Sequence, residues 1–467
     1  MSLRFVFALV LLVFPGLLSR SLQAAERPNV LVIIADDLGY HDLGINGGRD
    51  VPTPNIDALA AAGVRCTNGY ASCPYCSPAR AGLLTGKYQT RFGHEFNPHE
   101  GDETKLGLPL DQRTIADYLR SAGYATCAIG KWHEGFSSAF QPQSRGFDDF
   151  FGFLVGAHNF ILRSTDAPKF GSAYSYNLIY RGREPQKLDG YATDLFTDEA
   201  LRFIDRQAGK PWFVYLAYNA VHTPLEILDQ HKSRLPTDVT DRDRLGYLSL
   251  LLGLDDAIGR VNEHLRRTKL DRDTLVVFIG DNGGSGRKPF FAYNTGINTP
   301  LRGDKGQTLE GGIRVPLFVS WPGKLPAGTT YAEPIIGLDV LPTALAAAGA
   351  TIPGGLDGVD LLPRLTGQDK TPPHEALYWR FGPQKAVRRG AWKLVDWRDF
   401  DAKRDSGWQL YDLASDIGEQ HDLAASQPQL VSELSQAWDA WNKQNIPPLW
   451  HGAVAEDPTA KPAKKKR

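Results

Sequence analysis

The chain has 467 residues, of which 42% are apolar and 22% charged, so it can form one large domain and a smaller one. Its formal net charge of -1 gives no long-range attraction for nucleic acid or an anionic membrane. No nucleic-acid partner is therefore expected, and any anion site has to be built from locally placed cations.

The N-terminus has the three-part layout of a secretory signal: a basic start, an apolar run over residues 5–18, and small residues ending at Ala24 and Ala25. The run is too short for a comfortable membrane span, although an uncleaved anchor is the alternative. We therefore expect a signal peptide over residues 1–25 and an exported protein, periplasmic or secreted, with no membrane span after its removal. The cysteines Cys66, Cys73, Cys76 and Cys127 are few for an exported chain, so disulfides are not expected to hold the fold.

Apolar runs with few polar breaks indicate strands that are buried on both faces of a sheet. They cover residues 29–35, 125–130, 212–218 and 274–280. Helical patterns alternate with them, over residues 53–63, 114–122, 194–207 and 240–267. This alternation predicts an α/β fold with a mostly parallel, doubly wound sheet, in which chemistry gathers beyond the carboxyl ends of the strands.

After about Gly367 the pattern changes to short, aromatic-rich strands over residues 377–381, 385–388, 391–395 and 409–413, and a last helix over residues 430–441. We therefore expect a large domain over residues 26–367 and a small antiparallel-sheet-plus-helix domain over residues 368–455. A solvated basic tail follows over residues 456–467.

Two carboxylates stand side by side directly after the first predicted strand, at Asp36 and Asp37. Their repulsion is costly unless a cation lies between them, although an isolated Asp-Asp is more often a helix cap or a solvated turn. Asp281 and Asn282, which follow the fourth strand and precede two glycines, favour the cation. Three carboxylates and an amide oxygen suit calcium or magnesium rather than zinc.

The stretch SCPYCSPAR, residues 72–80, has two interpretations. Cys73 and Cys76 have the spacing of a thiol redox centre, but such centres belong to small thioredoxin-like units. Alternatively, Pro78 lies in the first turn of a helix, which places Cys76 at a helix N-terminus where N–H groups favour an anion. Arg80 adds a fixed fork of donors. The second interpretation predicts an oxyanion site that contains a reactive side chain.

The sequence from Cys76 to Arg80, with Leu84-Thr85-Gly86 after it, resembles the signature of the type I sulfatases, whose cysteine is converted to formylglycine. Other segments resemble the family in family order: NVLVIIADDLGY, TPNIDALAAAGVRCTNGYAS, GYATCAIGKWHEG, GFDDFFGF, HTP, GDNGG, TPLRGDKGQTLEGGIRVP and LYDLASDIGEQHDLA. The resemblance covers almost the whole mature chain. Within the family, the sequence is similar to the arylsulfatase-like, bacterial carbohydrate sulfatase branch. Ala79 stands where many members have Ser, and Glu134 replaces a common Leu, but neither touches the residues that the maturation signature requires.

This resemblance implies an alkaline-phosphatase-like α/β catalytic domain, a small C-terminal domain, a calcium ion, and a partner that converts Cys76, either a formylglycine-generating enzyme or an anaerobic maturation enzyme. The implied calcium ligands are Asp36, Asp37, Cys76, Asp281 and Asn282. Catalytic roles are implied for Cys76, Arg80, Lys131, His133, His222 and Lys305. A lone lysine is usually solvated and a lone histidine often structural, but their convergence at strand ends favours the functional interpretation.

In the implied mechanism, a hydroxyl of the hydrated formylglycine attacks the sulfate ester while calcium, Arg80, Lys131 and Lys305 hold the sulfate oxygens. His222, with Lys305 nearby, protonates the departing alcohol. His133 then takes a proton from the second hydroxyl, and sulfate leaves.

Two stretches are candidate sugar-binding walls. Residues 91–99 are similar to that stretch in bacterial sulfatases that act on sulfated carbohydrates, including galactose-based algal polymers, although a structural loop with a buried His94 is the alternative. Residues 287–298 carry aromatic side chains that suit sugar rings. The individual candidates are His94, Glu95, Asn97, Arg287 and Tyr293.

We therefore expect a sulfatase that acts on a sulfated carbohydrate of the algal galactan or glycosaminoglycan type. One alternative is a phosphonate or phosphate ester hydrolase on the same fold. The others are a non-catalytic carbohydrate-sulfate-binding protein with an unconverted cysteine, and a thiol oxidoreductase.

Overall fold

The computed structural model describes residues 27–98, 106–165, 178–207, 209–286, 293–397 and 407–451. The predicted signal peptide, the basic tail and Arg287 lie outside these ranges. Within them, no helix combines the length and the apolar character that crossing a bilayer requires.

A ten-stranded mixed sheet lies at the centre of the described part of the chain, in the order β13-β2-β12-β11-β1-β10-β4-β5-β7-β8. Its central strands are parallel: β11 (Thr274–Gly280), β1 (Asn29–Ala35), β10 (Trp212–Ala217), β4 (Ala125–Lys131) and β5 (Asp149–Phe153). The outer strands are β12 (Leu317–Ser320), β2 (Val64–Cys66), β13 (Thr329–Tyr331), β7 (Ile179–Arg181) and β8 (Glu184–Gln186). Here β12 runs antiparallel to β11, and β7 antiparallel to β5, so the sheet is mixed only towards its edges.

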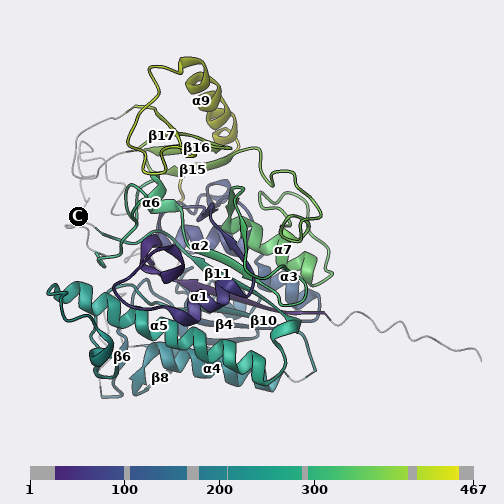
Figure 1. Ribbon diagram of the computed structural model, residues 1–467. Coiled ribbons are helices and arrows are strands. Elements are labelled where there is room, and N and C mark those ends of the chain that lie inside the picture. The colour runs from purple at the N-terminus through teal and green to yellow at the C-terminus, as the bar shows by residue number, and fades with distance from the viewer. Residues whose placement is uncertain are drawn as a thin grey trace, which may run out of the picture.

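Helices cover both faces of this sheet because its central strands are apolar on both sides. In β1, for example, Val32 and Ile34 face one core and Leu31 and Ile33 face the other. The first core contains α2 (Cys76–Thr85), α3 (Ile115–Ser121) and α7 (Val340–Ala347). The second contains α1 (Pro54–Ala61), α4 (Ala192–Arg206) and α5 (Arg242–Arg267). Figure 1 shows the two helix layers on opposite sides of the strands, which confirms the predicted doubly wound fold.

A separate four-stranded antiparallel sheet follows, as predicted. It consists of β15 (Leu377–Phe381), β16 (Gln384–Arg389), β17 (Trp392–Asp396) and β18 (Gln409–Asp412). The last helix, α9 (Pro428–Asn442), packs on this sheet through Leu434, Trp438 and Trp441. In Figure 1 this unit lies at the top, directly above the short helix α6 (Glu310–Ile313). Besides short 3-10 helices, the other elements of the described residues are the strands β3 (Gly69–Tyr70), β14 (Ile335–Ile336), β6 (Ile161–Leu162) and β9 (Gly190–Tyr191), and the helix α8 (Leu362–Leu365).

Candidate active site

The parallel strands bring the predicted polar side chains to one edge of the sheet. In the sheet register Ala35 of β1 lies beside Gly280 of β11, and Ala217 of β10 lies beside Gly130 of β4. The residues that follow these four strands are therefore neighbours, although they come from distant parts of the chain. They are Asp36 and Asp37 after β1, Lys131 at the end of β4, His222 after β10, and Asp281 and Asn282 after β11.

Two lysines neutralise the adjacent carboxylates. The Lys131 Nζ lies 2.7 Å from Asp36 Oδ2, and the Lys305 Nζ lies 2.7 Å from Asp37 Oδ2. All four side chains are buried. Burial on its own raises the pKa of Asp36, but Lys131 and other cations outweigh it and hold that pKa below its usual value. Asp36 is therefore an ionised carboxylate, and with Asp37 it forms a pair whose members each contact a lysine.

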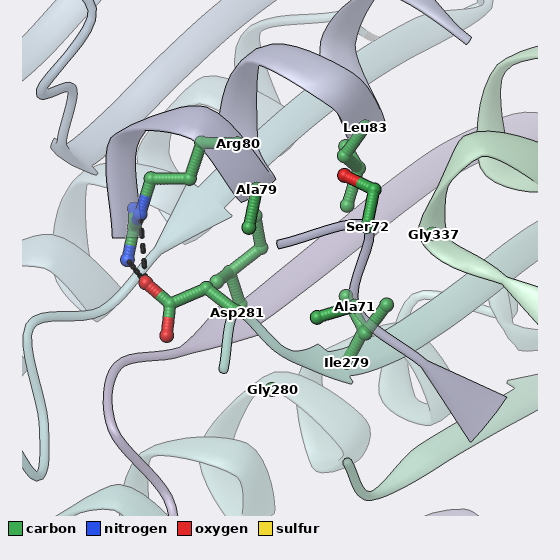
Figure 2. Close-up of a pocket in the computed structure, with 10 residues that line it drawn as sticks. Ala71, Ser72, Ala79, Arg80, Leu83, Ile279, Gly280, Asp281 and Gly337 are labelled. Atoms are coloured by element: carbon green, nitrogen blue, oxygen red, sulfur yellow. Dashed lines mark hydrogen bonds and ion pairs between the residues drawn. The ribbon is translucent and has the colours of Figure 1, made fainter. Parts of the chain in front are cut away.

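Arg80 joins the second half of the site to the first. Its Nε and Nη2 donate to Asp281 Oδ2 at 3.0 and 2.8 Å, as Figure 2 shows, and its Nη1 donates to the Lys131 carbonyl at 3.1 Å. Its Nη2 also lies 3.6 Å from Asp36 Oδ1. Figure 2 shows a largely apolar cavity that is lined in part by Arg80 and Asp281. Its lining includes none of Cys76, Lys131, His133, His222 or Lys305, so it is not the substrate pocket.

Cys76 is the first residue of α2, as the sequence predicts, and only 1% of it is exposed. Its Sγ lies 3.7 Å from Asp36 Oδ1 and 3.8 Å from Asp37 Oδ1. Burial raises the pKa of the thiol to about 12, although Lys131 and Lys305 oppose that shift. The unmodified side chain is therefore a protonated thiol and a weak nucleophile at neutral pH. All four cysteines are free in the structure.

Two histidines flank the charged cluster. The His222 Nε2 lies 3.5 Å from Asp37 Oδ2, and its Nδ1 contacts the Thr223 carbonyl at 2.8 Å. Burial lowers the pKa of both His222 and His133, and in His133 the cations Lys131 and Arg80 lower it further. His133 also has a left-handed backbone, with φ of 61°, and packs against Gly156, where an added Cβ would lie 2.7 Å from the ring. Both rings are therefore neutral near pH 7 and able to exchange a proton.

The donor atoms fit a hard divalent cation. Ligand atoms of Asp36, Asp37, Cys76 and His222 lie within 4.8 Å of one another, and all four side chains are buried. Asp281 Oδ1 is tied to this group because it accepts a hydrogen bond from the Asp37 N–H at 3.2 Å. The Asn282 amide nitrogen donates to Asp37 Oδ1 at 2.7 Å, whereas its buried Oδ1 has no hydrogen-bond partner among the described residues. An unsatisfied buried oxygen on the side chain that bonds to Asp37 is what an oxygen-ligated ion would satisfy.

The candidate sugar-binding residues lie in different surroundings. His94 is fully buried, with its Nε2 2.6 Å from Ser77 Oγ, and Asn97 Oδ1 accepts from the Ser77 N–H at 3.0 Å. Glu95 accepts from Arg380 at 2.7 Å and from the Gly382 N–H at 2.9 Å. His94 and Asn97 therefore contact Ser77 in the first turn of α2, Glu95 contacts the end of β15, and all three bond to the protein itself. Tyr293 is partly buried and Arg287 is outside the described residues, so a role toward substrate stays a prediction for all five.

Some residues that hold the site together were missed in the sequence. Asn294 is fully buried, and its amide nitrogen donates to the Asp37 carbonyl at 2.8 Å and to the Val221 carbonyl at 3.2 Å. Asn298 makes two hydrogen bonds to Gly284: its Oδ1 accepts from the Gly284 N–H and its amide nitrogen donates to the Gly284 carbonyl, each at 2.9 Å. Both asparagines lie in the segment YNTGIN, and the two asparagines on either side of Gly296 were the available signal. Asn294 fixes the backbone at Asp37, a candidate metal ligand, and at Val221, the residue before His222.

A buried cysteine among paired charges, at the carboxyl edge of the parallel part of the sheet, is an arrangement typical of α/β ester hydrolases with an alkaline-phosphatase-like fold. Comparison with known proteins identifies the family. The family model described as Sulfatase matches residues 28–350, and that described as N-sulphoglucosamine sulphohydrolase, C-terminal, matches residues 303–444. Arylsulfatase A of Bos taurus is 33% identical, over 90% of this chain and 88% of its own length. N-acetylgalactosamine-6-sulfatase of Sus scrofa is also 33% identical, over 80% of this chain and 72% of its own.

Solved structures agree with this result. The crystal structure of Ps i-CgsB in complex with k-i-k-neocarrahexaose superposes with a TM-score of 0.84 at 33% identity, over 92% of this chain and 96% of that one. Phosphonate monoester hydrolase of Agrobacterium radiobacter, at 20% identity and a TM-score of 0.63, shares the fold. The chain belongs to the sulfatase family and is a sulfuric ester hydrolase, as the sequence predicts.

Proposed function

We propose that this protein hydrolyses sulfate monoesters of a sulfated carbohydrate, of the algal galactan or glycosaminoglycan type, with formylglycine at Cys76 and calcium beside it. The carrying observation is the position of Cys76 at the start of α2, between Asp36 and Asp37 and beside the cations of the site. The sugar assignment is supported by relatives whose names refer to N-acetylgalactosamine-6-sulfate and by the neocarrahexaose complex. The predicted signal peptide supports export to the periplasm or the medium, where such polysaccharides are met.

The conversion of Cys76 is supported by the chemistry of the thiol. Its raised pKa leaves it protonated, and a thiol cannot release sulfate after attack in the way that an aldehyde hydrate can. A hydrated formylglycine supplies a hydroxyl for attack on sulfur and a second hydroxyl through which sulfate is released. A formylglycine-generating or anaerobic maturation enzyme is therefore the implied partner.

Calcium is the proposed ion because the surrounding donors are carboxylates and an amide oxygen. Asp36, Asp37, Asp281, Asn282 and the modified Cys76 would hold it, and when bound it would withdraw charge from the sulfate oxygens. Arg80, Lys131 and Lys305 bind the other oxygens, because all three are buried cations at the same edge of the sheet.

The two histidines carry the protons. His222, beside Asp37, has to take up a proton before it can protonate the departing sugar oxygen, and neutral His133 accepts a proton from the second hydroxyl of the hydrate, so that sulfate leaves. Lys305, which pairs with the same Asp37 carboxylate as His222, lies close enough to support the first of these transfers.

The test measures sulfate release from defined sulfated galactan and glycosaminoglycan oligosaccharides by protein co-expressed with a maturing enzyme. We expect release by the wild type and none by Cys76→Ala. Mass spectrometry of the tryptic peptide Cys66 to Arg80 should show formylglycine in the active protein. An intact thiol at Cys76 in that preparation would instead support a carbohydrate-sulfate-binding protein.

Two further arms test the chemistry. Chelation of divalent ions should abolish sulfate release and lower the melting temperature, and calcium should restore both better than magnesium. Aryl sulfate and aryl phosphonate are compared in parallel. Faster phosphonate turnover at saturation of both substrates would replace the proposed reaction with that of a phosphonate ester hydrolase.

A further inference from the structure

The loop that carries Lys305 is held at three points by the small C-terminal sheet and the segment that follows it. At its start the Arg302 Nη1 donates to the Tyr411 hydroxyl at 3.1 Å and to the Glu419 carbonyl at 2.8 Å. At its end the Glu310 N–H donates to Glu419 Oε2 at 2.8 Å. Figure 1 shows why these contacts are possible: α6, which begins at Glu310, lies directly beneath the sheet.

Gln384, the first residue of β16, makes the third contact, at the middle of the loop. Its amide nitrogen donates to the Gly306 carbonyl at 2.7 Å, and its Oε1 accepts from the Thr308 N–H at 3.2 Å. The side chain is fully buried. Because a buried amide is costly when unsatisfied, the glutamine and the loop backbone fix each other.

These contacts determine where the ammonium of Lys305 lies. Its Nζ is 2.7 Å from Asp37 Oδ2 and 5.2 Å from the centre of the Tyr75 ring, which stacks on Phe381 of β15 at 5.4 Å. The adjacent Gly306 N–H donates to the Pro74 carbonyl at 2.8 Å. A lysine has a long flexible stem, so its charge stays at one place only if its backbone and its neighbours do.

We propose that Gln384 is a positioning residue for Lys305, and that the small sheet is by this contact a working part of the active site. Gln384 touches no reacting atom; it acts by holding the backbone at Gly306 and Thr308. The proposal rests on the proposed function only in the role given to Lys305.

A double-mutant cycle tests this coupling. In Gln384→Met, which keeps a long unbranched side chain but loses both hydrogen bonds, we expect kcat for a sulfate ester to fall by between about tenfold and a hundredfold, because small misplacements of catalytic groups have effects of this size. KM should change less. Lys305→Met should be worse, and the double variant no worse than Lys305→Met, because Gln384 acts through that lysine.

A matched control separates positioning from loss of stability. Val387→Ala removes buried methyl groups from the same strand without touching the loop, so it should lower the melting temperature but leave kcat close to wild type well below that temperature. Multiplying effects in the double variant, or an unchanged kcat in Gln384→Met, would overturn the proposal.

Hydrogen exchange gives a readout that needs no activity. Amides of residues 305–309 should exchange faster in Gln384→Met than in the wild type or Val387→Ala. If the wild type hydrolyses no sulfate ester, the proposed function fails, yet this exchange result still decides whether Gln384 holds the loop. Unchanged exchange in an active enzyme would remove the positioning role and leave the sulfatase assignment intact.

Discussion

The role of Arg80 in the site depends on the planar shape of its guanidinium as well as on its charge. Two of its nitrogens donate to one oxygen of Asp281, and a third reaches the Lys131 carbonyl, so the guanidinium ties three segments of the site together. Lysine carries the same charge, but as a point charge without a planar fork. Charge and geometry can therefore be separated at this position.

We expect Arg80→Lys to lower kcat for an aryl sulfate by about a hundredfold, because losing one preorganised donor to a developing oxyanion has an effect of this order. The control is Arg91→Lys. The native Arg91 guanidinium lies 2.8 Å from Asp357, and this ion pair is not part of the cluster around Cys76. That variant should keep its kcat. Steady-state kinetics on both proteins decides the matter, and near-wild-type turnover in Arg80→Lys would mean that charge alone suffices.

At the scale of the element, α2 begins without a cap from its own N-cap residue. Tyr75 makes no side-chain hydrogen bond there, and the Ser77 N–H is satisfied instead by Asn97, twenty residues further along the chain. Because α2 begins at Cys76, this distant cap helps to fix the position of that residue. A structural role for Asn97 competes directly with the predicted role in sugar binding.

Asn97→Ala should lower the free energy of unfolding by about 1 kcal/mol, the usual effect of losing a helix cap. Asn97→Asp keeps the acceptor oxygen and should lose much less. Thermal or urea unfolding measures both, and KM for a sulfated oligosaccharide is measured alongside. A raised KM with unchanged stability in Asn97→Ala would favour the sugar-binding role over the cap.

The sequence predicted the elements whose pattern is long and continuous. The apolar runs of β1, β4, β10 and β11 ended within one residue of their predicted limits, because strands buried on both faces tolerate few polar residues. The short strands β2, β12 and β13 were missed. Their three or four residues carry no periodicity that distinguishes them from loops.

The same difference applies to the site. Asp36, Asp281 and Lys131 follow predictable strands, so their convergence at one edge of the sheet could be predicted. Asn294 and Gln384 each act through two hydrogen bonds to backbone that only the folded chain brings near them. No spacing in the sequence records such a contact.

For the whole molecule, acid stability depends on buried neutral histidines. Burial lowers the pKa of His94 to about 3 and that of His158 to about 4, against an ordinary value of 6.5. Between pH 6.5 and these lowered values the unfolded chain binds more protons than the folded one. The stability that each neutral histidine contributes is present above pH 6.5 and is lost as the pH falls through this range.

Replacing His94 should therefore make stability less dependent on pH. Between pH 6.5 and 4.5, the free energy of unfolding of the wild type should fall by up to about 1.4 kcal/mol per pH unit more than that of His94→Gln. This is the slope expected when the unfolded chain binds one more proton than the folded one. Unfolding free energies at a series of pH values give the slope. His421→Gln is the control, because 82% of the His421 side chain is exposed. Parallel pH curves for wild type and His94→Gln would contradict the expectation.

The depth of Cys76 has a consequence for biogenesis. Only 1% of Cys76 is exposed, so the thiol of the folded protein cannot enter the catalytic centre of another enzyme. The oxidation we propose must therefore happen on the newly made chain, before the two helix layers close over the sheet. The fraction of active molecules then depends on the rate of modification relative to the rate of folding. A molecule that folds before it is modified has to unfold again before Cys76 can be converted.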